Sequence, residues 1–273
     1  MSYLLLAAGA AILAYGLVIL HIYRGQDLRV YRPDRELITN PAEHGFDYER
    51  VTIRAADGVR LDAWYVPSPG ARRTLLFFHG NTRNISYCIE SIELFHRLGF
   101  NTLLFDYRGY GQSEGHVGER GTYLDAEAAW NYLLAERGHA PDDIVVLGRS
   151  LGAAIASHLA AHHTPCALAI ESTFTSLVDL GAELHPWVPV RWISRHRYPV
   201  IENIKSVRCP VLVIHARDDE LIPFHHGRSL YEAVPGEKVF LEIRGRHYDG
   251  FLATGSDYVD GLNEFFSRHC GAR

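Results

Sequence analysis

The sequence has few residues of the kinds that bind metals or nucleic acids. Only four cysteines occur among its 273 residues, Cys88, Cys166, Cys209 and Cys270, and their wide separation matches no metal-ligand spacing. The net charge is −5 and the basic residues are scattered, so no basic patch indicates nucleic-acid binding. Because three of the four cysteines fall in or beside predicted core elements, the sequence favours buried free thiols over disulfides.

The alternation of apolar runs with helical patterns indicates one α/β domain. Near-continuous apolar runs are typical of strands buried on both faces of a parallel sheet. The predicted strands cover residues 74–78, 101–106, 144–147, 166–170, 211–215 and 238–243, and the predicted helices include residues 84–98, 121–137, 153–161 and 258–268. Before them, residues 49–54 and 59–66 alternate polar with apolar side chains around Asp57-Gly58, which predicts an antiparallel hairpin. The sequence therefore predicts a mostly parallel central sheet with helices on both faces.

Residues 3–23 carry no formally charged side chain. As a helix they would span roughly 30 Å at about 1.5 Å per residue, which matches the hydrocarbon core of a bilayer. The chain lacks a basic start before this run, and the run is longer than that of a cleaved signal peptide. We expect residues 1–23 to be an uncleaved transmembrane anchor. A cleaved signal peptide and a buried helix of a soluble protein are the alternatives.

Arginines flank the apolar run on one side only. Those that follow it are Arg24, Arg29, Arg32 and Arg35, and no Lys or Arg precedes it. By the positive-inside rule this bias predicts a single-pass protein whose main domain lies on the cytoplasmic side of the membrane. Acidic residues between the arginines weaken the bias. Residues 24–48 are predicted to be a connecting arm that packs on the domain, and we assign no function to it.

A glycine-flanked serine follows the strand predicted at residues 144–147. In Gly148-Arg149-Ser150-Leu151-Gly152, a buried strand leads through a tight turn into the helix predicted at residues 153–161. Such a turn exposes a serine hydroxyl at the carboxyl end of the strand, and a side chain in place of either glycine would collide with a neighbouring element. The pattern predicts that Ser150 is a nucleophile on a nucleophile elbow. Here the sequence resembles the α/β-hydrolase family.

The resemblance extends from about residue 49 to residue 270. The motif D-Y-R-G-Y-G-Q-S at residues 106–113 is a strong mark of the family, which places this loop beside the active site without a catalytic role. The family also places one half of its oxyanion hole after His79-Gly80. The resemblance therefore assigns the backbone N–H of Asn81 to the oxyanion hole, with the N–H of Leu151 as the other half. An ordinary glycine turn at Gly80 is the alternative.

The other two members of a catalytic triad are expected on loops after later strands. The family pattern D-x-x-[VI]-P fits Asp219, and the competing Asp218 is predicted to bond local backbone N–H groups. His247 lies on a glycine-bearing loop after the final strand, where the family keeps its base, although the commoner G-G-x-H-N is replaced by G-R-H-Y. The order Ser150, Asp219, His247 is that of the α/β hydrolases.

Residues 172–205 interrupt the alternation of strands and helices. In the family an insertion at this place forms a cap over the pocket, so we expect a small cap within a hydrolase domain that covers residues 49–273. Trp187 and Trp192 have three possible roles: lining an acyl pocket, touching lipid, or packing the cap onto the body. Basic residues of this segment are candidates for contact with an anionic head group, namely Arg191, Arg195 and Arg197.

The membrane span and the small cap resemble membrane-anchored α/β-hydrolase proteins, which include protein depalmitoylases. The resemblance implies hydrolysis of carboxylic ester or thioester bonds in lipophilic acyl substrates through an acyl-enzyme on Ser150, with no metal or organic cofactor. We expect His225 and His226 at the surface rather than at a metal. The expected partners are a lipid-like or small acyl substrate and the membrane. A serine peptidase of the aminopeptidase-like type and a non-catalytic membrane scaffold are the alternatives.

Overall fold

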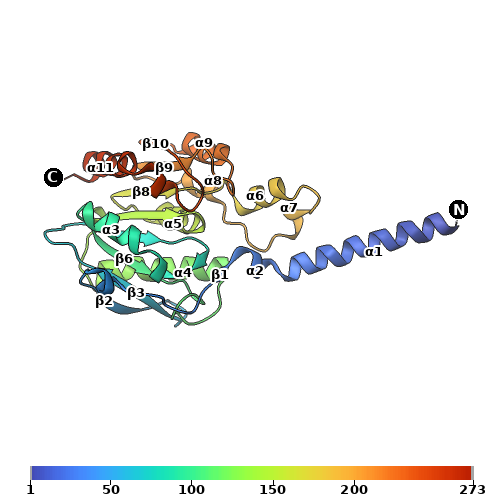
Figure 1. The fold of residues 1–273 in the computed structure, drawn as a ribbon, viewed down its shortest axis with the longest axis horizontal. Helices are drawn as coiled ribbons and strands as arrows, with labels where there is room; N and C mark the ends of the chain where they lie inside the picture. Colours follow the sequence, from blue (N-terminus) through green and yellow to red (C-terminus); the bar gives the residue numbers. More distant parts are fainter. Residues whose placement is uncertain (1, 272–273) are drawn as a thin grey trace.

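An eight-stranded sheet lies at the centre of the computed structural model, which describes residues 2–271 (Figure 1). Its spatial order is β10-β9-β8-β7-β4-β6-β3-β2, and all neighbours are parallel except for the pairs that include β3. The strands are β2 (Glu49–Arg54), β3 (Arg60–Val66), β4 (Thr74–Phe78), β6 (Asn101–Phe105), β7 (Ile144–Arg149), β8 (Ala167–Glu171), β9 (Val211–Ala216) and β10 (Lys238–Ile243). This architecture confirms the predicted fold.

Helices cover both faces of the sheet, so the strands have an apolar core on each side. In β4, Leu76 and Phe78 pack into one core, whereas Leu75 and Phe77 pack into the other, because successive side chains of a strand point to opposite faces. The first core contains residues of α4 (Glu119–Ala135), α5 (Leu151–His162), α8 (Val200–Ile204) and α9 (Phe224–Ala233), and the second contains residues of α3 (Ile89–Arg97) and α11 (Ser256–Cys270). Short helical turns complete the body at η2 (Ile85–Tyr87), η3 (Pro141–Asp143) and α10 (Gly250–Thr254).

The N-terminal helix α1 (Ser2–Arg24) projects from the body, and none of its residues is buried (Figure 1). It is long and apolar enough to cross a membrane, with a mean hydropathy of 2.3 over 18 residues. An apolar helix with no protein around it exposes surface that water does not solvate well, and a bilayer removes that cost. Met1 and residues 272–273, which belong to the predicted anchor and hydrolase domain, lie outside the described residues.

The arm after α1 packs against the body. It contains α2 (Gln26–Val30), β1 (Arg32–Pro33) and the turn η1 (Pro41–His44), and β1 pairs in parallel with β5 (Thr82–Arg83). Tyr31 of the arm is buried, and its hydroxyl bonds Nδ1 of His196 at 3.2 Å and the hydroxyl of Tyr198 at 2.9 Å. The arm is therefore held to the segment between β8 and β9.

We call that segment the cap, and its helices α6 (Leu177–Leu184) and α7 (Val190–Ile193) lie beside the end of α1 (Figure 1). Both cap tryptophans are exposed: 56% of the surface of Trp187 and 90% of that of Trp192 remain accessible. The predicted alternative in which they pack the cap onto the body is therefore wrong. Neither side chain lines the cavity beside Ser150 described below, so the acyl-pocket alternative is wrong too.

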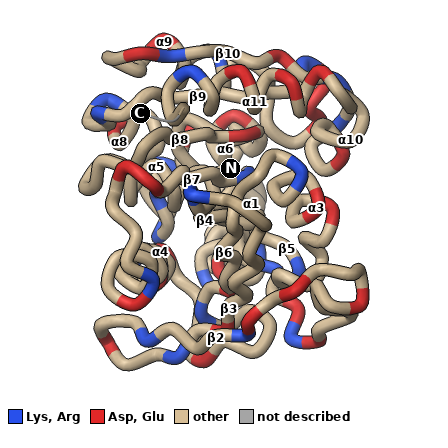
Figure 2. The backbone as a smooth tube through the Cα atoms, turned by 90° about the vertical axis from the view of Figure 1, so that its left-hand side faces the viewer, with Lys and Arg blue, Asp and Glu red and all other residues tan. Residues whose placement is uncertain are grey.

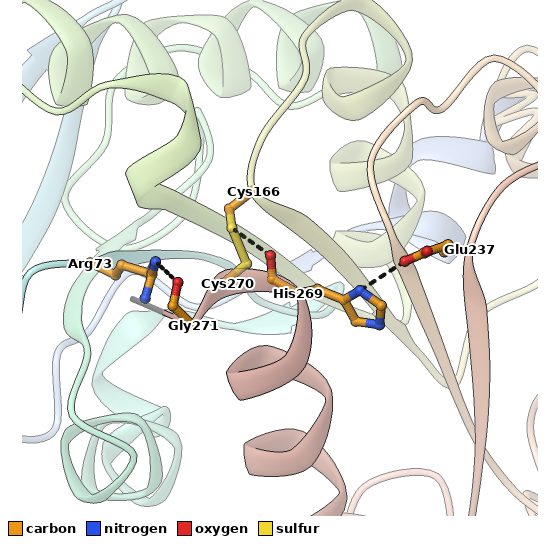
Figure 3. The surroundings of a disulfide bond; sticks show 6 residues. All are labelled: Arg73, Cys166, Glu237, His269, Cys270 and Gly271. Carbon is orange, nitrogen blue, oxygen red and sulfur yellow. Dashed lines mark hydrogen bonds and ion pairs between the residues drawn. A yellow bond between two sulfur atoms is a disulfide. The ribbon is translucent and has the colours of Figure 1, made fainter. Parts of the chain in front are cut away.

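Cys166 and Cys270 form a disulfide, which corrects the prediction of free thiols for this pair (Figure 3). The two residues are 104 positions apart in the chain, but α11 packs across the sheet and brings its last residue next to the start of β8, with a Cα–Cα distance of 5.9 Å. Sequence spacing carries no sign of such a contact. Cys88 and Cys209 are free, and burial raises the pKa of each thiol to about 12.

Charged residues of both signs are interspersed around the body (Figure 2). Several form ion pairs, such as Arg108 with Asp57 and Asp125, and Arg137 with Glu49.

Candidate active site

Ser150 stands at the turn between β7 and α5 with φ 55° and ψ −120°, a backbone conformation that non-glycine residues rarely adopt. The flanking glycines make this turn possible. A Cβ on Gly148 would lie 2.4 Å from the carbonyl oxygen of Gly152, and a Cβ on Gly152 would lie 2.1 Å from that of Phe78. Both contacts are with backbone that cannot move aside. The turn therefore has the geometry of a nucleophile elbow.

The structure brings the three predicted triad residues together from loops far apart in the sequence. Nε2 of His247 lies 3.0 Å from Oγ of Ser150, and Nδ1 of His247 lies 2.8 Å from Oδ2 of Asp219. A carboxylate can only accept, so the ring proton belongs on Nδ1, and Nε2 is left to accept the hydrogen of the serine hydroxyl. In this tautomer the imidazole can act as a base toward Ser150.

Asp219 accepts hydrogen bonds from the backbone as well as from His247. Its Oδ1 accepts the backbone N–H groups of Leu221 and Ile222 at 3.0 Å and 2.8 Å. Burial favours the neutral acid, but the hydrogen bond and charge of His247, together with these N–H groups, outweigh it and lower the pKa of Asp219. The local turn bonds predicted for Asp218 are therefore made by Asp219, and Asp218 is exposed.

No sequence signal pointed to Glu220, which contacts the loop of His247. Oε2 of Glu220 accepts the backbone N–H of His247 at 3.1 Å. This bond links the loop of Asp219 to the loop of His247 independently of the bond between their side chains. An acidic residue at an exposed loop position has no distinctive pattern, so only the folded chain reveals this contact.

Asn81 and Leu151, the predicted oxyanion residues, line one cavity with Ser150. Gly80 lies next to the elbow, because a Cβ built on it would be 3.9 Å from Cβ of Ser150. The other polar groups of Asn81 are occupied: its side chain donates to the carbonyl of Val30, and its carbonyl accepts from the N–H of Arg32. Within residues 2–271, no hydrogen bond uses the N–H of Asn81.

The D-Y-R-G-Y-G-Q-S loop makes hydrogen bonds to the backbone that follows β4. The hydroxyl of Tyr107 donates to the carbonyl of His79, and the hydroxyl of Tyr110 donates to that of Asn81, both at 2.8 Å. His79 itself bonds the carbonyl of Gly80 through Nδ1, and burial lowers its pKa to about 4, so its ring is neutral. These contacts fix the carbonyl groups of residues 79–81 and so orient the backbone of this segment.

An apolar cavity of about 580 Å³ opens beside Ser150. Its walls come from the cap, the arm and the last turn of α1; the apolar residues among them include Ile22, Val30, Phe174, Leu177, Leu180, Val188 and Ile193. The arm residues were not predicted as part of the site. Their sequence shows only mixed charges and prolines, and their place at the cavity depends on the pairing of β1 with β5.

A second cavity of about 570 Å³ meets the first at Ser150 and His247. Charged side chains contribute to its lining, namely Arg83, Glu90 and Arg149. Arg149 is paired with Glu171 at 3.0 Å and lies 4.0 Å from the ring centre of Phe251. Ser150 thus stands between an apolar cavity and a more polar one.

One group within residues 2–271 has the composition of a metal site: Glu183, His225 and His226. His225 is exposed as predicted, but the prediction that His226 is a surface residue is wrong, because it is buried against the loop after β8. Nδ1 of His226 accepts the N–H of Thr175 at 3.1 Å, so the proton of the neutral ring is on Nε2, which faces Glu183 at 3.3 Å. Because Nδ1 already accepts a hydrogen bond, a metal at Nε2 would remove the only ring proton, so the group fits a neutral His226 facing Glu183 better than a metal site.

Comparison with known proteins gives the family. The family model described as alpha/beta hydrolase fold matches residues 73–189. The Arabidopsis thaliana alpha/beta hydrolase domain-containing protein WAV2 is 31% identical over 251 residues, which cover 84% of this chain and 82% of the relative. The chain belongs to the α/β-hydrolase family.

Two further relatives and a solved structure extend this result. Rv2307c of Mycobacterium tuberculosis is 36% identical over 260 residues, 94% of this chain and 92% of the relative. The Saccharomyces cerevisiae membrane protein YNL320W is 30% identical over 256 residues, 89% of each chain, which agrees with a membrane anchor at α1. The Pyrococcus furiosus esterase Pf2001 shares the fold with a TM-score of 0.73 at 23% identity, covering 88% of this chain and all of its own.

Proposed function

We propose that the protein is a membrane-anchored serine hydrolase that cleaves carboxylic ester or thioester bonds of lipophilic acyl substrates. One observation carries the proposal: the hydrogen-bonded series from Ser150 through His247 to Asp219 opens into an apolar cavity. A nucleophile with an oriented base is the arrangement that acyl transfer requires. The likeness to an esterase structure agrees with it at the level of the fold.

The first half of the reaction forms an acyl-enzyme. Nε2 of His247 takes the proton of the Ser150 hydroxyl as Oγ attacks the acyl carbonyl carbon, and Asp219 stabilises the imidazolium that results. The N–H groups of Asn81 and Leu151 stabilise the negative oxygen of the tetrahedral intermediate, and loss of one such donor costs about 10²–10³ in rate in a comparable enzyme. The intermediate collapses when the alkoxide or thiolate leaves with the proton of His247.

The second half of the reaction releases the acid. Water attacks the acyl carbon, His247 removes its proton, and a second tetrahedral intermediate forms in the same oxyanion hole. Collapse breaks the bond to Oγ, and His247 returns the proton to Ser150. Atoms and charge balance over the cycle, and each turnover consumes one water and yields one acid and one alcohol or thiol.

The two cavities suggest where the halves of the substrate bind. The cavity of the cap and arm is largely apolar, and its volume of about 580 Å³ is within the roughly 300–1,000 Å³ that is typical of ligand sites. It suits the acyl chain. The second cavity, with Arg83, Glu90 and Arg149 in its lining, suits a more polar leaving group.

We also propose that the body lies on the cytoplasmic side of the membrane, because the arginines that flank α1 follow it. The disulfide between Cys166 and Cys270 favours the opposite side, since the cytoplasm keeps most thiols reduced. In the proposed orientation this pair is a dithiol in the cell that closes on oxidation. The arginines and the disulfide thus indicate opposite sides of the membrane, and a topology measurement decides between them.

Labelling of the membrane-bound protein by a fluorophosphonate probe tests the proposed reaction. The intact protein should be labelled and should hydrolyse p-nitrophenyl esters, whereas Ser150→Ala should lose both, since deletion of a triad serine elsewhere costs about 10⁶ in turnover. Thioesters and aminoacyl amides assayed in parallel distinguish esterase or thioesterase from peptidase activity. Folded protein that neither labels nor hydrolyses any of these substrates would contradict the proposal and favour a non-catalytic scaffold.

A further inference from the structure

The cap contacts α1 well inside the apolar span. The hydroxyl of Tyr15 donates to the backbone carbonyl of Trp187 at 2.8 Å. Tyr15 precedes Arg24 by nine residues, which places it about 14 Å along the helix from the charged end. Since half of a bilayer core is about 15 Å thick, the cap reaches the depth of the hydrocarbon if α1 crosses the membrane along its normal.

The same contact satisfies two polar groups that hydrocarbon would not solvate. The Tyr15 hydroxyl and the Trp187 carbonyl each cost free energy if they are placed in lipid without a hydrogen-bond partner. Each is the partner of the other. A tyrosine in the middle of an apolar span that bonds a loop of the same chain is therefore consistent with a loop at that depth.

A group of polar contacts fixes the cap in this position just below the span. Oε1 of Gln26 accepts the N–H of Arg195, and Nε2 of Gln26 donates to the carbonyl of Ile193, both at 2.8 Å. Asp27 pairs with Arg195 at 3.0 Å and with His196 at 2.7 Å. The charged groups lie at the end of α1, where lipid head groups would be, and the apolar part of the cap lies beyond them along the helix.

We define the cap tip as residues 184–193. Three of its large apolar side chains are exposed, Leu184 at 50%, Trp187 at 56% and Trp192 at 90%, and the backbone of Trp187 bonds to α1, a helix with no buried residue. Single exposed apolar residues are common, but a group of them that is continuous with a transmembrane helix marks a membrane contact. Tryptophan is also enriched where protein meets the membrane interface.

We propose that the cap tip inserts into the leaflet nearest the body, beside the C-terminal half of α1. The lipid leaflet is the occupant of this surface, because the surface is an extension of the one that α1 presents to lipid. In this arrangement α1 and the cap tip are embedded in the membrane together, and the contacts of the arm with the cap fix their relative position.

This insertion gives the apolar cavity a route from the bilayer, a consequence that rests on the proposed function. Ile22 of α1 and Leu184, Val188 and Ile193 of the cap tip all line the cavity that reaches Ser150. An acyl chain could therefore pass from the leaflet to the serine without crossing water. A lipophilic substrate would thereby avoid the free-energy cost of exposing its acyl chain to water, which entry from solvent would require.

Tryptophan quenching by brominated lipids tests the insertion with the full chain in phosphatidylcholine vesicles. Of the four tryptophans, Trp64 and Trp130 are buried in the body, so they serve as internal references, while Trp187 and Trp192 are in the cap tip. Lipids brominated along the acyl chain should reduce the emission of the intact protein. The double variant Trp187→Phe, Trp192→Phe keeps the apolar surface and should lose this quenching.

Equal quenching of the intact protein and the double variant would overturn the insertion, whether the tip faces water, a second copy or another protein. Trp192→Asp provides a second readout, because Trp192 lines neither cavity. Hydrolysis of a long-chain ester in vesicles should fall severalfold, and hydrolysis of a short soluble ester should stay unchanged. Equal loss on both substrates would overturn the entry route. If the intact protein hydrolyses neither ester, the proposed function fails while the quenching result still decides the insertion.

Discussion

His247 and Asp219 are joined by a hydrogen bond of 2.8 Å between Nδ1 and Oδ2, and the other oxygen of the same carboxylate is held by two backbone N–H groups. The carboxylate therefore cannot rotate away from the imidazole without losing bonds on both oxygens. A ring held in this way presents Nε2 to Ser150 in the tautomer that accepts a proton.

Asp219→Asn should lower turnover by about 10⁴ with little change in fold, because an amide in place of the carboxylate allows the imidazole tautomer that carries its proton on Nε2. Asp218→Asn is the matched control: it removes an exposed carboxylate from the adjacent position and should leave turnover unchanged. Ester hydrolysis by both variants gives the answer. Comparable losses in the two would mean that Asp219 is not the partner of the base.

The pH dependence of stability should also report on Asp219. Its pKa is lowered in the folded protein, so the ionised form stabilises the fold above the unfolded value of about 3.9, and this contribution is lost as the pH falls through the folded pKa. Between about pH 5 and pH 2, the free energy of unfolding of the intact protein should fall more steeply than that of Asp219→Asn. Denaturant titrations in detergent micelles would measure both slopes. Parallel slopes would contradict this account.

Leu177→Trp should shorten the acyl chain that the protein accepts. Leu177 lines the apolar cavity and is partly buried, so a larger side chain occupies volume that a long chain would need. The kcat/KM for long p-nitrophenyl esters should drop by at least tenfold relative to short ones. Leu252→Trp enlarges a residue of the second cavity and should leave the chain-length profile unaltered. A shifted profile in Leu252→Trp alone would reverse our assignment of the cavities.

Topology decides the state of Cys166 and Cys270. If the body is cytoplasmic, alkaline phosphatase fused at the C-terminus of the chain should be inactive, and both thiols should react with maleimide in acid-quenched, denatured cells. An active fusion with an unreactive cysteine pair would place the body outside. In that case the disulfide would be part of the native fold, and by a chain-entropy argument would stabilise it by about 4–5 kcal/mol for a loop of this length.

The strands and the elbow were predictable because each depends on neighbours in sequence. The apolar run before Ser150, the glycines around it and the helix-forming alanines after it all act within some fifteen residues. The resemblance to the α/β hydrolases assigned Asp219 and His247, through the pattern D-x-x-[VI]-P and the glycine-bearing loop after the final strand. Their contacts with Ser150 follow from the fold, which the sequence pattern indicated.

The contacts of the arm, the cap and the cysteines could not be predicted, because they join residues that are far apart in the sequence. Tyr15 meets Trp187 across 172 positions, Gln26 meets Ile193 across 167, and Cys166 meets Cys270 across 104. No periodicity or turn signal links residues at such distances, so the exposure of Trp192 and the burial of His226 were equally undetermined.

The sequence by itself determined which elements form and, through the family resemblance, which serine, aspartate and histidine could meet. Local backbone sterics and the alternation of apolar side chains indicate the elements and the elbow, and the family resemblance assigned the aspartate and the histidine. Only the tertiary structure decided what surrounds them: the arm as a wall of the cavity, the bond from the His247 backbone to Glu220, and the cap beside α1. These depend on packing between distant segments, where the free energy comes from surfaces that the linear order of residues does not display.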